Sequence, residues 1–373
     1  RGNRKGIARW MCGWGKCEGK ATSYEVKFMK NRIKWVDIIK FFGIFTIYLG
    51  HFGEVAGLGY AFVYSHHVPL FFLVSGCMEI YNQEKNLGKS IIGNVKKILI
   101  PFFFFGIVSI VFNVLLNNIS SLNEIKNMLI SLAKGAIRND FFAGGLWFLT
   151  CLFVIKLEFY FIKKVKIKSL IIIICLCMYY ISERVISPRP ILQPHWIYNI
   201  DSSFYYIIFY AIGYVSFPKI QKLFQLENKR NHIIFYTAGI MSILYAAFLF
   251  FGKDFLTKIP DVLYISLFIP IVRAVIVIWM YFFVARCCNN IQVMVDIGKN
   301  TLYLCGTEYI IKNVMACIIS TLCLGLNFIS PISVYIYTYI LLLLANKYFV
   351  PIEKRIIMRH MCLCKNKNFS HKN

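Results

Sequence analysis

The chain has 373 residues, of which 58% are hydrophobic and 16% are charged, and its mean hydropathy is +0.61. A water-soluble surface of this size does not tolerate such a composition, so we expect a membrane protein rather than a soluble globular one. The net charge of +25 does not indicate a nucleic-acid partner, because the basic residues lie between apolar stretches instead of forming one face or tail, and we find no nucleic-acid-binding motif.

The first 28 residues have neither an initiator methionine nor a clear pattern, whereas the sequence from Met29, MKNRIKWVDIIKFF, resembles a natural start. Whether residues 1–28 belong to the native protein is left open. No cleavable signal peptide is visible, because the first apolar stretch is too long for such a peptide and lacks a small-residue cleavage site. We expect residues 1–34 to form a cytoplasmic N-terminal tail.

Ten apolar segments follow, each judged against the about 17 to 25 residues that a helix needs to cross a bilayer. We therefore expect an all-α fold, a polytopic membrane bundle of about ten transmembrane helices. The segments 169–182 and 203–217 are short, so they are either tilted or form a re-entrant pair. The ten expected segments are 36–51, 61–80, 98–116, 146–162, 169–182, 203–217, 233–251, 262–285, 301–320 and 329–350.

Lysine and arginine are distributed unevenly over the segments that connect these helices. With the N-terminus inside, thirty of them fall in the predicted cytoplasmic stretches and seven in the alternate loops. By the positive-inside rule, both termini are cytoplasmic and His51 lies at the outer face. We expect a transmembrane domain over residues 35–350 and a basic cytoplasmic tail over residues 351–373.

The first segment carries a lysine and a histidine eleven residues apart. On a helix, that spacing is about 16 Å of rise and roughly 20° of rotation, so Lys40 and His51 share one face, and Asp37 can pair with Lys40. Charged residues inside a membrane are candidates for function. The alternative is structural: Lys40 reaches the inner interface and His51 ends the helix at the outer one.

His51 is followed three residues later by Glu54. An imidazole ionises near neutral pH and can take a proton from a hydroxyl group, and a neighbouring carboxylate can fix its tautomer. We therefore predict His51 as a general base toward a hydroxyl group, with Glu54 as its orienting partner. The pairing requires the helix to continue through Gly53, which glycine does not favour.

Two other apolar segments contain charged residues. Glu308 and Lys312 are four residues apart, so an intrahelical ion pair is at least as good an interpretation as a catalytic role. Arg273 has no acidic partner within four residues in its segment. It is a candidate for binding an anionic ligand or for pairing with another helix.

The predicted outer stretch SPRPILQPHWIYNID carries His195 and Trp196, which are suited to binding a sugar by hydrogen bonds and stacking. An aromatic belt at the membrane interface explains Trp196 equally well. We add Trp147, in the stretch GGLWFLT, to the candidate substrate-binding residues.

Thirteen cysteines do not form a recognisable disulfide or zinc pattern. The pairs Cys12 and Cys17, and Cys362 and Cys364, lack a His/Cys quartet with zinc spacing, so we expect no metal. Reduced packing residues are expected at Cys151, Cys175, Cys177, Cys305 and Cys317.

Six stretches in order over about residues 31–350 resemble the integral-membrane acyltransferase family 3, whose members O-acylate mostly extracytoplasmic carbohydrates. The opening RIKWVDIIKFFGIFTIYLGH is similar to the family's first helix, in which a basic residue, ten residues and a histidine form a signature. The others are VPLFFLVSGCMEI, KKILIPFFFFG, GGLWFLTCLFVIKL, FYYIIFYAIGYVSF and VDIGKNTLYLCGTEYIIK.

Three positions depart from the family pattern. Lys40 stands where an arginine is usual, which keeps the charge but loses the planar guanidinium. Asn94 and Lys97 stand where the family has two arginines, with Lys96 as a possible substitute. Many members have a histidine at the position of Glu308, so no role is transferred to that residue.

The resemblance implies an O-acyltransferase with acetyl-CoA, or a similar acyl thioester, as donor and a cell-surface or lipid-linked carbohydrate as acceptor. We expect Lys40, Lys96, Lys97 and Arg273 to bind the anionic donor. Its pantetheine arm is expected to thread the bundle along the stripe from Lys40 to His51, where His51 serves as a general base or, less favourably, as a transient acyl carrier. The resemblance also implies a multi-pass protein of the bacterial inner membrane that takes part in O-acetylation of polysaccharide. The oligomeric state is not indicated.

A transporter or flippase of lipid-linked sugars is the alternative from another class, because it would also be polytopic and basic inside. It predicts charges on several helices and inverted internal symmetry, of which we find little. A polysaccharide polymerase would have a longer outer loop than the longest one expected here, which has about 28 residues.

Overall fold

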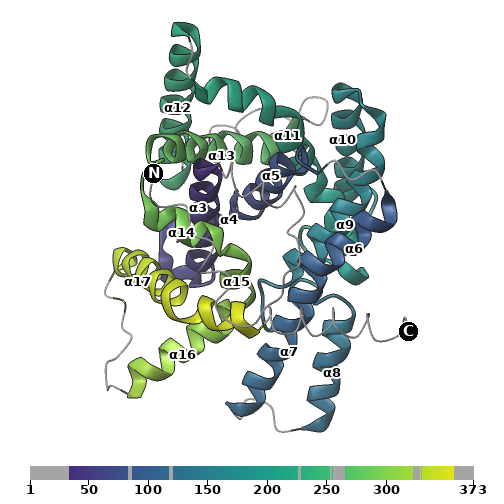
Figure 1. The fold of residues 1–373 in the computed structure, drawn as a ribbon, viewed down its shortest axis with the longest axis vertical. Coiled ribbons are helices and arrows are strands. Elements are labelled where there is room, and N and C mark those ends of the chain that lie inside the picture. The colour runs from purple at the N-terminus through teal and green to yellow at the C-terminus, as the bar shows by residue number, and fades with distance from the viewer. Residues whose placement is uncertain are drawn as a thin grey trace, which may run out of the picture. The chain divides into compact units, whose positions relative to one another are not determined.

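The computed structural model is all-helical in the residues that it describes, which are 33–82, 86–116, 121–225, 228–252, 254, 265–321, 328 and 330–356. The chain divides into residues 1–34 and a compact unit formed by residues 35–373. Everything below concerns the second unit (Figure 1). The N-terminal segment 1–28 and most of the predicted C-terminal tail lie outside the described residues.

The first part of the unit is a series of helices separated by short turns. One long apolar helix combines α6, a π-helical turn η2 and α7 without interruption. The bounds are α3 (Lys34–Gly50), η1 (Gly53–Ala56), α4 (Leu58–Tyr64), α5 (His67–Glu79), α6 (Leu87–Asn94), η2 (Val95–Leu99), α7 (Ile100–Leu115), α8 (Leu122–Ala133) and α9 (Trp147–Ile162).

The second part contains the longest single α-helix of the described chain, α11, which has 26 residues. Its remaining helices include a second π-helical turn, η7, after α17. The bounds are η3 (Lys163–Val165), α10 (Lys168–Arg184), η4 (Ile197–Asn199), α11 (Ile200–Gln225), α12 (Lys229–Phe250), η6 (Ile265–Phe268), α13 (Ile269–Cys287), α14 (Gln292–Lys299), α15 (Thr301–Gly306), α16 (Glu308–Thr321), α17 (Pro331–Leu344) and η7 (Ala345–Phe349).

Each of the ten expected segments overlaps helix in the described residues, but 61–80 and 301–320 are each divided between two helices. The helix expected over 203–217 is longer than we predicted. It is α11, which has 26 residues and a length of about 39 Å at 1.5 Å per residue. Three α-helices of the described part, α6, α8 and α14, lie in stretches that we expected to be loops. The helix after η7 continues to Ile356, beyond the expected domain end at residue 350.

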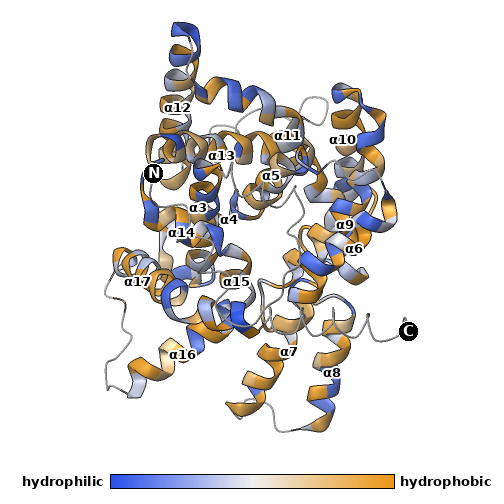
Figure 2. Cartoon of the chain, viewed as in Figure 1, coloured by the Kyte–Doolittle hydropathy of each residue, from blue (hydrophilic) through white to orange (hydrophobic). Residues whose placement is uncertain are grey.

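Five helices of the described part are long and apolar enough to cross a membrane, judged by length and composition. They are Leu58–Glu79, Leu87–Leu115, Lys229–Phe250, Ser266–Cys287 and Pro331–Ile356. Figure 2 shows apolar residues along much of α7, α10 and α12. Several of the large apolar side chains on these helices are exposed, among them Val111, Leu115 and Met241, as expected for surfaces that contact lipid rather than water.

The centre of the bundle is α11, which packs against α5, α9 and α10. Its contact with α5 is made close by two glycines. A Cβ atom on Gly76 would overlap the backbone carbonyl of Tyr210, and one on Gly213 would overlap that of Leu73. Small residues let helix backbones approach in this way inside a membrane, where dispersion contacts rather than water exclusion drive association.

Candidate active site

The end of α3 sets the position of His51. The helix ends at Gly50, and His51 continues its pattern by one backbone hydrogen bond, from its N–H to the carbonyl of Ile47. Gly53 then adopts a positive φ of 64°, a conformation that glycine reaches without steric cost. The chain turns away into η1, and the His51 side chain is left at the end of the helix with 34% of its surface exposed.

His51 is paired with a carboxylate that lies 257 residues further along the chain. Its Nδ1 is 2.7 Å from Oε1 of Glu308, whose side chain is 6% exposed. Lys312, one turn later on α16, places its Nζ 2.8 Å from the same oxygen. The carboxylate therefore lies between an imidazole and an ammonium group.

Lys312 also secures the end of α3. Its Nζ donates a hydrogen bond to the carbonyl of Tyr48, 3.1 Å away, in the last turn of that helix. Such carbonyls have no partner within the helix, and a cation stabilises them. The Tyr48 hydroxyl in turn donates to the carbonyl of Leu304 on α15, at 2.7 Å. Two long-range bonds thus fix α3 against α15 and α16.

The expected helix over 301–320 is interrupted, and the interruption orients Glu308. Thr307 separates α15 from α16, so Glu308 is the first residue of α16. The N-terminus of a helix stabilises a negative charge through its free N–H groups and its dipole. The local structure therefore favours an ionised Glu308, as does the ammonium group of Lys312.

A cavity of about 470 Å³ opens beside this group. It is lined by the turn after α3, the chain before α9, the end of α15 and the first turns of α16. The residues that give it polar character are His51, Tyr60, Tyr64, Glu308, Tyr309, Lys312 and Asn313. The volume is within the range of small-molecule sites, about 300 to 1,000 Å³.

The pairing determines what His51 can do in this cavity. An ionised carboxylate only accepts hydrogen bonds, so the His51 Nδ1 must donate its hydrogen to Glu308. In a neutral ring, the other nitrogen, Nε2, then carries the lone pair. That is the arrangement of a general base held in one tautomer by a carboxylate.

Glu54 is not the partner that the sequence suggested. It lies in η1, beyond the positive-φ Gly53, and is exposed. The helix ends before it, so the spacing of three residues no longer places it beside His51. Glu308 lies beside His51 in the position that Glu54 was expected to occupy.

The predicted route for the donor along α3 is closed. Lys40 forms an ion pair with Asp37 at 3.7 Å, as the spacing suggested, and its side chain is 28% exposed. Between Lys40 and His51, however, Ile44 is 0% and Ile47 is 8% exposed. The face that joins the two residues is therefore packed against neighbours, and no open passage follows it.

Lys96 and Lys97 lie on the π-helical turn η2, and both are exposed. This turn joins α6 to α7 in one continuous helix, and it packs on α9. π-Helical turns are frequent at functional sites, which agrees with the prediction that these lysines bind a ligand but does not test it.

Arg273 has a protein partner. Its guanidinium forms an ion pair with Asp254, which follows α12, and Asp254 also accepts a hydrogen bond from the Tyr245 hydroxyl at 3.0 Å. The residue is in the second turn of α13, inside the candidate membrane span Ser266–Cys287. The inter-helix alternative is therefore the one observed, and we do not place Arg273 in the donor site.

The three candidate sugar-binding residues do not line the cavity. Trp147 is 7% exposed and lies under the guanidinium of Arg138, so it is packed inside the protein. His195 and Trp196 are exposed, and their backbone N–H groups both donate to the buried carboxylate of Asp201. The structure brings neither of these two residues to His51.

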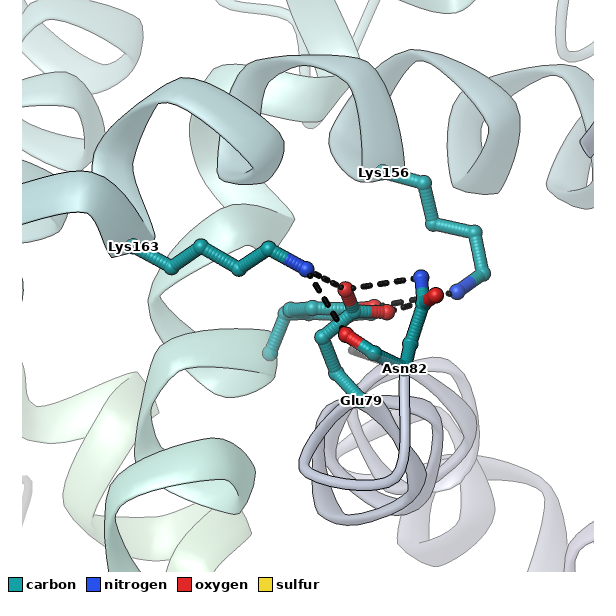
Figure 3. A network of polar contacts seen from close by, with 5 residues as sticks. Glu79, Asn82, Lys156 and Lys163 are labelled. Atoms are coloured by element: carbon teal, nitrogen blue, oxygen red, sulfur yellow. Dashed lines mark hydrogen bonds and ion pairs between the residues drawn. The ribbon is translucent and has the colours of Figure 1, made fainter. Parts of the chain in front are cut away.

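A second polar cluster, the Glu79 cluster, joins α5, α9 and α11 (Figure 3). The Glu79 carboxylate is 4% exposed. Lys163 is 2.6 Å and Lys156 2.9 Å from its oxygens, and Tyr210 and Asn82 donate further hydrogen bonds to it at 2.8 and 3.0 Å. The members of this cluster are distant in sequence, so no spacing within one segment indicates it.

Within the described residues, no group of three or more His, Cys, Asp or Glu side chains could hold a metal ion. The pairs Cys12 and Cys17, and Cys362 and Cys364, lie outside the described residues. The described cysteines are free, including Cys151, Cys175, Cys177, Cys305 and Cys317.

One comparison with known proteins gives a match. The model of acyltransferase family 3, described as an acyltransferase domain, matches residues 33–353. Neither a curated protein nor a solved structure matches the chain. The matched region includes α3, the cavity and both polar clusters.

Proposed function

The chain belongs to acyltransferase family 3, and we propose that this integral membrane acyltransferase moves an acetyl group from acetyl-CoA to a hydroxyl of a cell-surface or lipid-linked carbohydrate. The observation that carries the proposal is the His51–Glu308 pair at the edge of a polar cavity. We place the protein in the bacterial inner membrane.

The pair supports a single-step transfer. The Nε2 of His51 takes the proton of the acceptor hydroxyl as the hydroxyl oxygen attacks the carbonyl carbon of the thioester. A carbon–oxygen bond forms, and the carbon–sulfur bond breaks. The leaving thiolate takes the proton from His51, which yields the ester, free coenzyme A thiol and a neutral histidine. Glu308 acts through His51 as a positioning residue, because it holds the ring and stabilises its protonated form.

The lining of the cavity supports an acceptor that arrives from outside. Three of the lining segments, 50–53, 60–64 and 142–145, lie in or beside stretches that the charge distribution predicts to be at the outer face. Hydroxyl, amide and aromatic groups at Tyr60, Tyr64 and Asn313 are suited to hydrogen bonding and stacking with a sugar.

On the donor side, we propose that Lys40, Lys96 and Lys97 bind the phosphates of acetyl-CoA from the cytoplasm. Lysine binds phosphate as a point charge. Because Ile44 and Ile47 close the face of α3, the pantetheine arm reaches His51 only if these helices separate or if it follows another path.

A transporter or flippase of lipid-linked sugars is the weaker candidate. The chain belongs to a family of acyltransferases, and a histidine paired with a carboxylate lines the cavity. Both observations favour acyl transfer over transport. The two functions also differ in outcome, since loss of a transporter shortens or removes surface glycan, whereas loss of a transferase leaves the chains and removes their acyl groups.

The test compares surface glycan by mass spectrometry in cells with the gene, without it, and with His51→Gln. We expect acetyl groups only with the unaltered gene, at equal glycan length in all three. The control is His195→Gln, an exposed histidine outside the cavity, which should retain acetylation. Full acetylation by folded His51→Gln protein would reject the assignment, and loss of the glycan itself would support the transporter.

A further inference from the structure

An apolar groove adjoins the active-site cavity on the side of α7 and α16. It has a volume of about 370 Å³ and is lined by Phe112 and Leu116 of α7 and by Val314, Cys317, Ile318 and Thr321 of α16. These six side chains expose almost only carbon and sulfur to it. Its lining therefore differs sharply from that of the polar cavity next to it.

The groove and the cavity meet along α16. Tyr309 and Asn313 line the cavity, and Cys317 and Thr321 line the groove. These four residues follow at intervals of four, so they form a ridge that winds slowly around the helix over about 18 Å. Asn313 of the cavity and Val314 of the groove are neighbours in the chain, so the two spaces are sections of one stretch of α16.

A hydrogen bond marks the border between the two sections. The Tyr309 hydroxyl donates to Oδ1 of Asn113 at 2.7 Å. Asn113 follows Phe112 of the groove directly and is 5% exposed. It holds α7 against α16 at the point where the polar lining gives way to the apolar one. A molecule that fits both sections has a polar end and a hydrocarbon end.

The position of the groove favours the acceptor as that molecule. Leu116 directly precedes the predicted outer loop 117–144, and Thr321 is the first residue of the predicted outer loop 321–328, so the groove lies at the outer end of α7. Next to it, Val111 and Leu115 expose 52% and 73% of their surface, as side chains in contact with lipid do. A chain held in the outer half of the bilayer can enter the groove from the side, whereas the donor is proposed to come from the cytoplasm.

We propose that the groove binds the hydrocarbon chain of a lipid-linked glycan, so that the acceptor is acylated while it is still attached to its lipid carrier. The proposal rests on the proposed function and narrows its acceptor to the lipid-linked class. The sugar occupies the cavity beside His51, and the lipid lies along Cys317 and Thr321. A free polysaccharide gains nothing from such an apolar surface.

The test compares two tryptophan variants of α16 with the unaltered protein in its own cells. Cys317→Trp fills the groove, and Ala316→Trp places the same side chain at an exposed neighbouring position outside it. Lipid-linked glycan and finished surface glycan are extracted separately, and the acetyl content of each is measured by mass spectrometry. Protein amount and monodispersity in detergent establish that each variant folds.

We expect acetyl groups already on the lipid-linked pool. Cys317→Trp should reduce them about tenfold or more, since contacts worth about two buried methylene groups are lost. Ala316→Trp should leave them unchanged. Acetyl groups on the finished glycan alone would overturn the inference and leave the proposed function intact. Acetyl groups on neither pool would reject the proposed function itself.

Two further outcomes would also overturn the inference. If the two folded tryptophan variants acetylate the lipid-linked pool equally, the groove has no part in binding the acceptor. In isolated membranes, a defect of Cys317→Trp that appears with octanoyl-CoA but not with acetyl-CoA would assign the groove to the donor's acyl chain. A second groove variant, Thr321→Trp, guards against an effect peculiar to position 317.

Discussion

Glu308 and Glu79 are both buried carboxylates held between two nitrogen-bearing side chains, and comparing them distinguishes a candidate active site from a structural cluster. Glu79 has four protein partners from three segments, and all of them bind it within the packed bundle. Glu308 has His51 and Lys312, and its group faces a cavity of about 470 Å³.

The difference shows that a buried charge in a membrane protein is not by itself a sign of catalysis. Both clusters satisfy the rule that such charges are paired and face the interior. Only the Glu308 group combines a titratable ring, a fixed tautomer and space for a substrate. The Glu79 cluster ties α5 to α9 and α11, which already approach closely at Gly76 and Gly213. The predictions below test that separation of roles.

The largest effect is expected for His51→Ala. Removal of a general base costs about 10² to 10⁴-fold in rate. Acetyl transfer should therefore fall by that factor per folded molecule in isolated membranes, while the amount of inserted protein stays normal. His195→Ala, the matched exposed histidine, should retain activity. A His51→Ala protein with more than half of the normal rate would remove the active-site assignment.

Glu79→Ala should affect stability instead of chemistry. Loss of one partner from a buried ion pair costs about 3 to 5 kcal/mol, because Lys156 and Lys163 are left without their counter-charge. We expect faster thermal inactivation of the detergent-solubilised protein and an unchanged rate per folded molecule. If the folded variant transfers no acetyl group, the Glu79 cluster belongs to the reaction and the comparison fails.

Glu308→Gln should lower the turnover rate on the order of a hundredfold, since the amide no longer fixes the His51 tautomer or stabilises its protonated form. The KM for acetyl-CoA should change little. Glu308→Asp keeps the carboxylate and should recover part of the rate. Equal losses in the Gln and Asp variants would mean that Glu308 only packs, without orienting the ring.

Lys312→Met should have the smallest effect. His51 keeps its carboxylate, so we expect a rate within about tenfold of normal. The ion pair with Glu308 and the hydrogen bond to Tyr48 are both lost, which should lower stability by about 1 to 2 kcal/mol. Lys312→Arg keeps the charge and is the control. If Lys312→Met lowers the rate as much as Glu308→Gln does, Lys312 contacts the reacting atoms and this prediction is wrong.

Much of the helical structure could be predicted from the sequence. All ten expected apolar segments are helical, because a run of apolar residues of bilayer length has few other ways to satisfy its backbone in lipid. The amphipathic helices α6, α8 and α14 were missed, because they are short and carry polar residues like those of loops. The length of α11 was underestimated, because lysines and glutamines extend it beyond its apolar part.

The candidate site was only half predictable. Its histidine lies in a recognisable pattern with Lys40 at the other end of one helix, and the spacing of residues along a helix is a local property. The partner of that histidine was assigned to Glu54 because the two are neighbours in sequence. Gly53 reverses the chain between them, and the true partner lies on another helix.

The sequence by itself determined that this is a helical membrane protein, where its apolar segments lie and that His51 stands at the end of one of them, since composition and short-range periodicity govern these properties. Only the tertiary structure decided that Glu308 meets His51, that Ile44 and Ile47 close the face between Lys40 and His51, and that Arg273 is already paired. The reason is physical: each of these facts depends on how helices distant in sequence pack together, and no spacing within one segment records that packing.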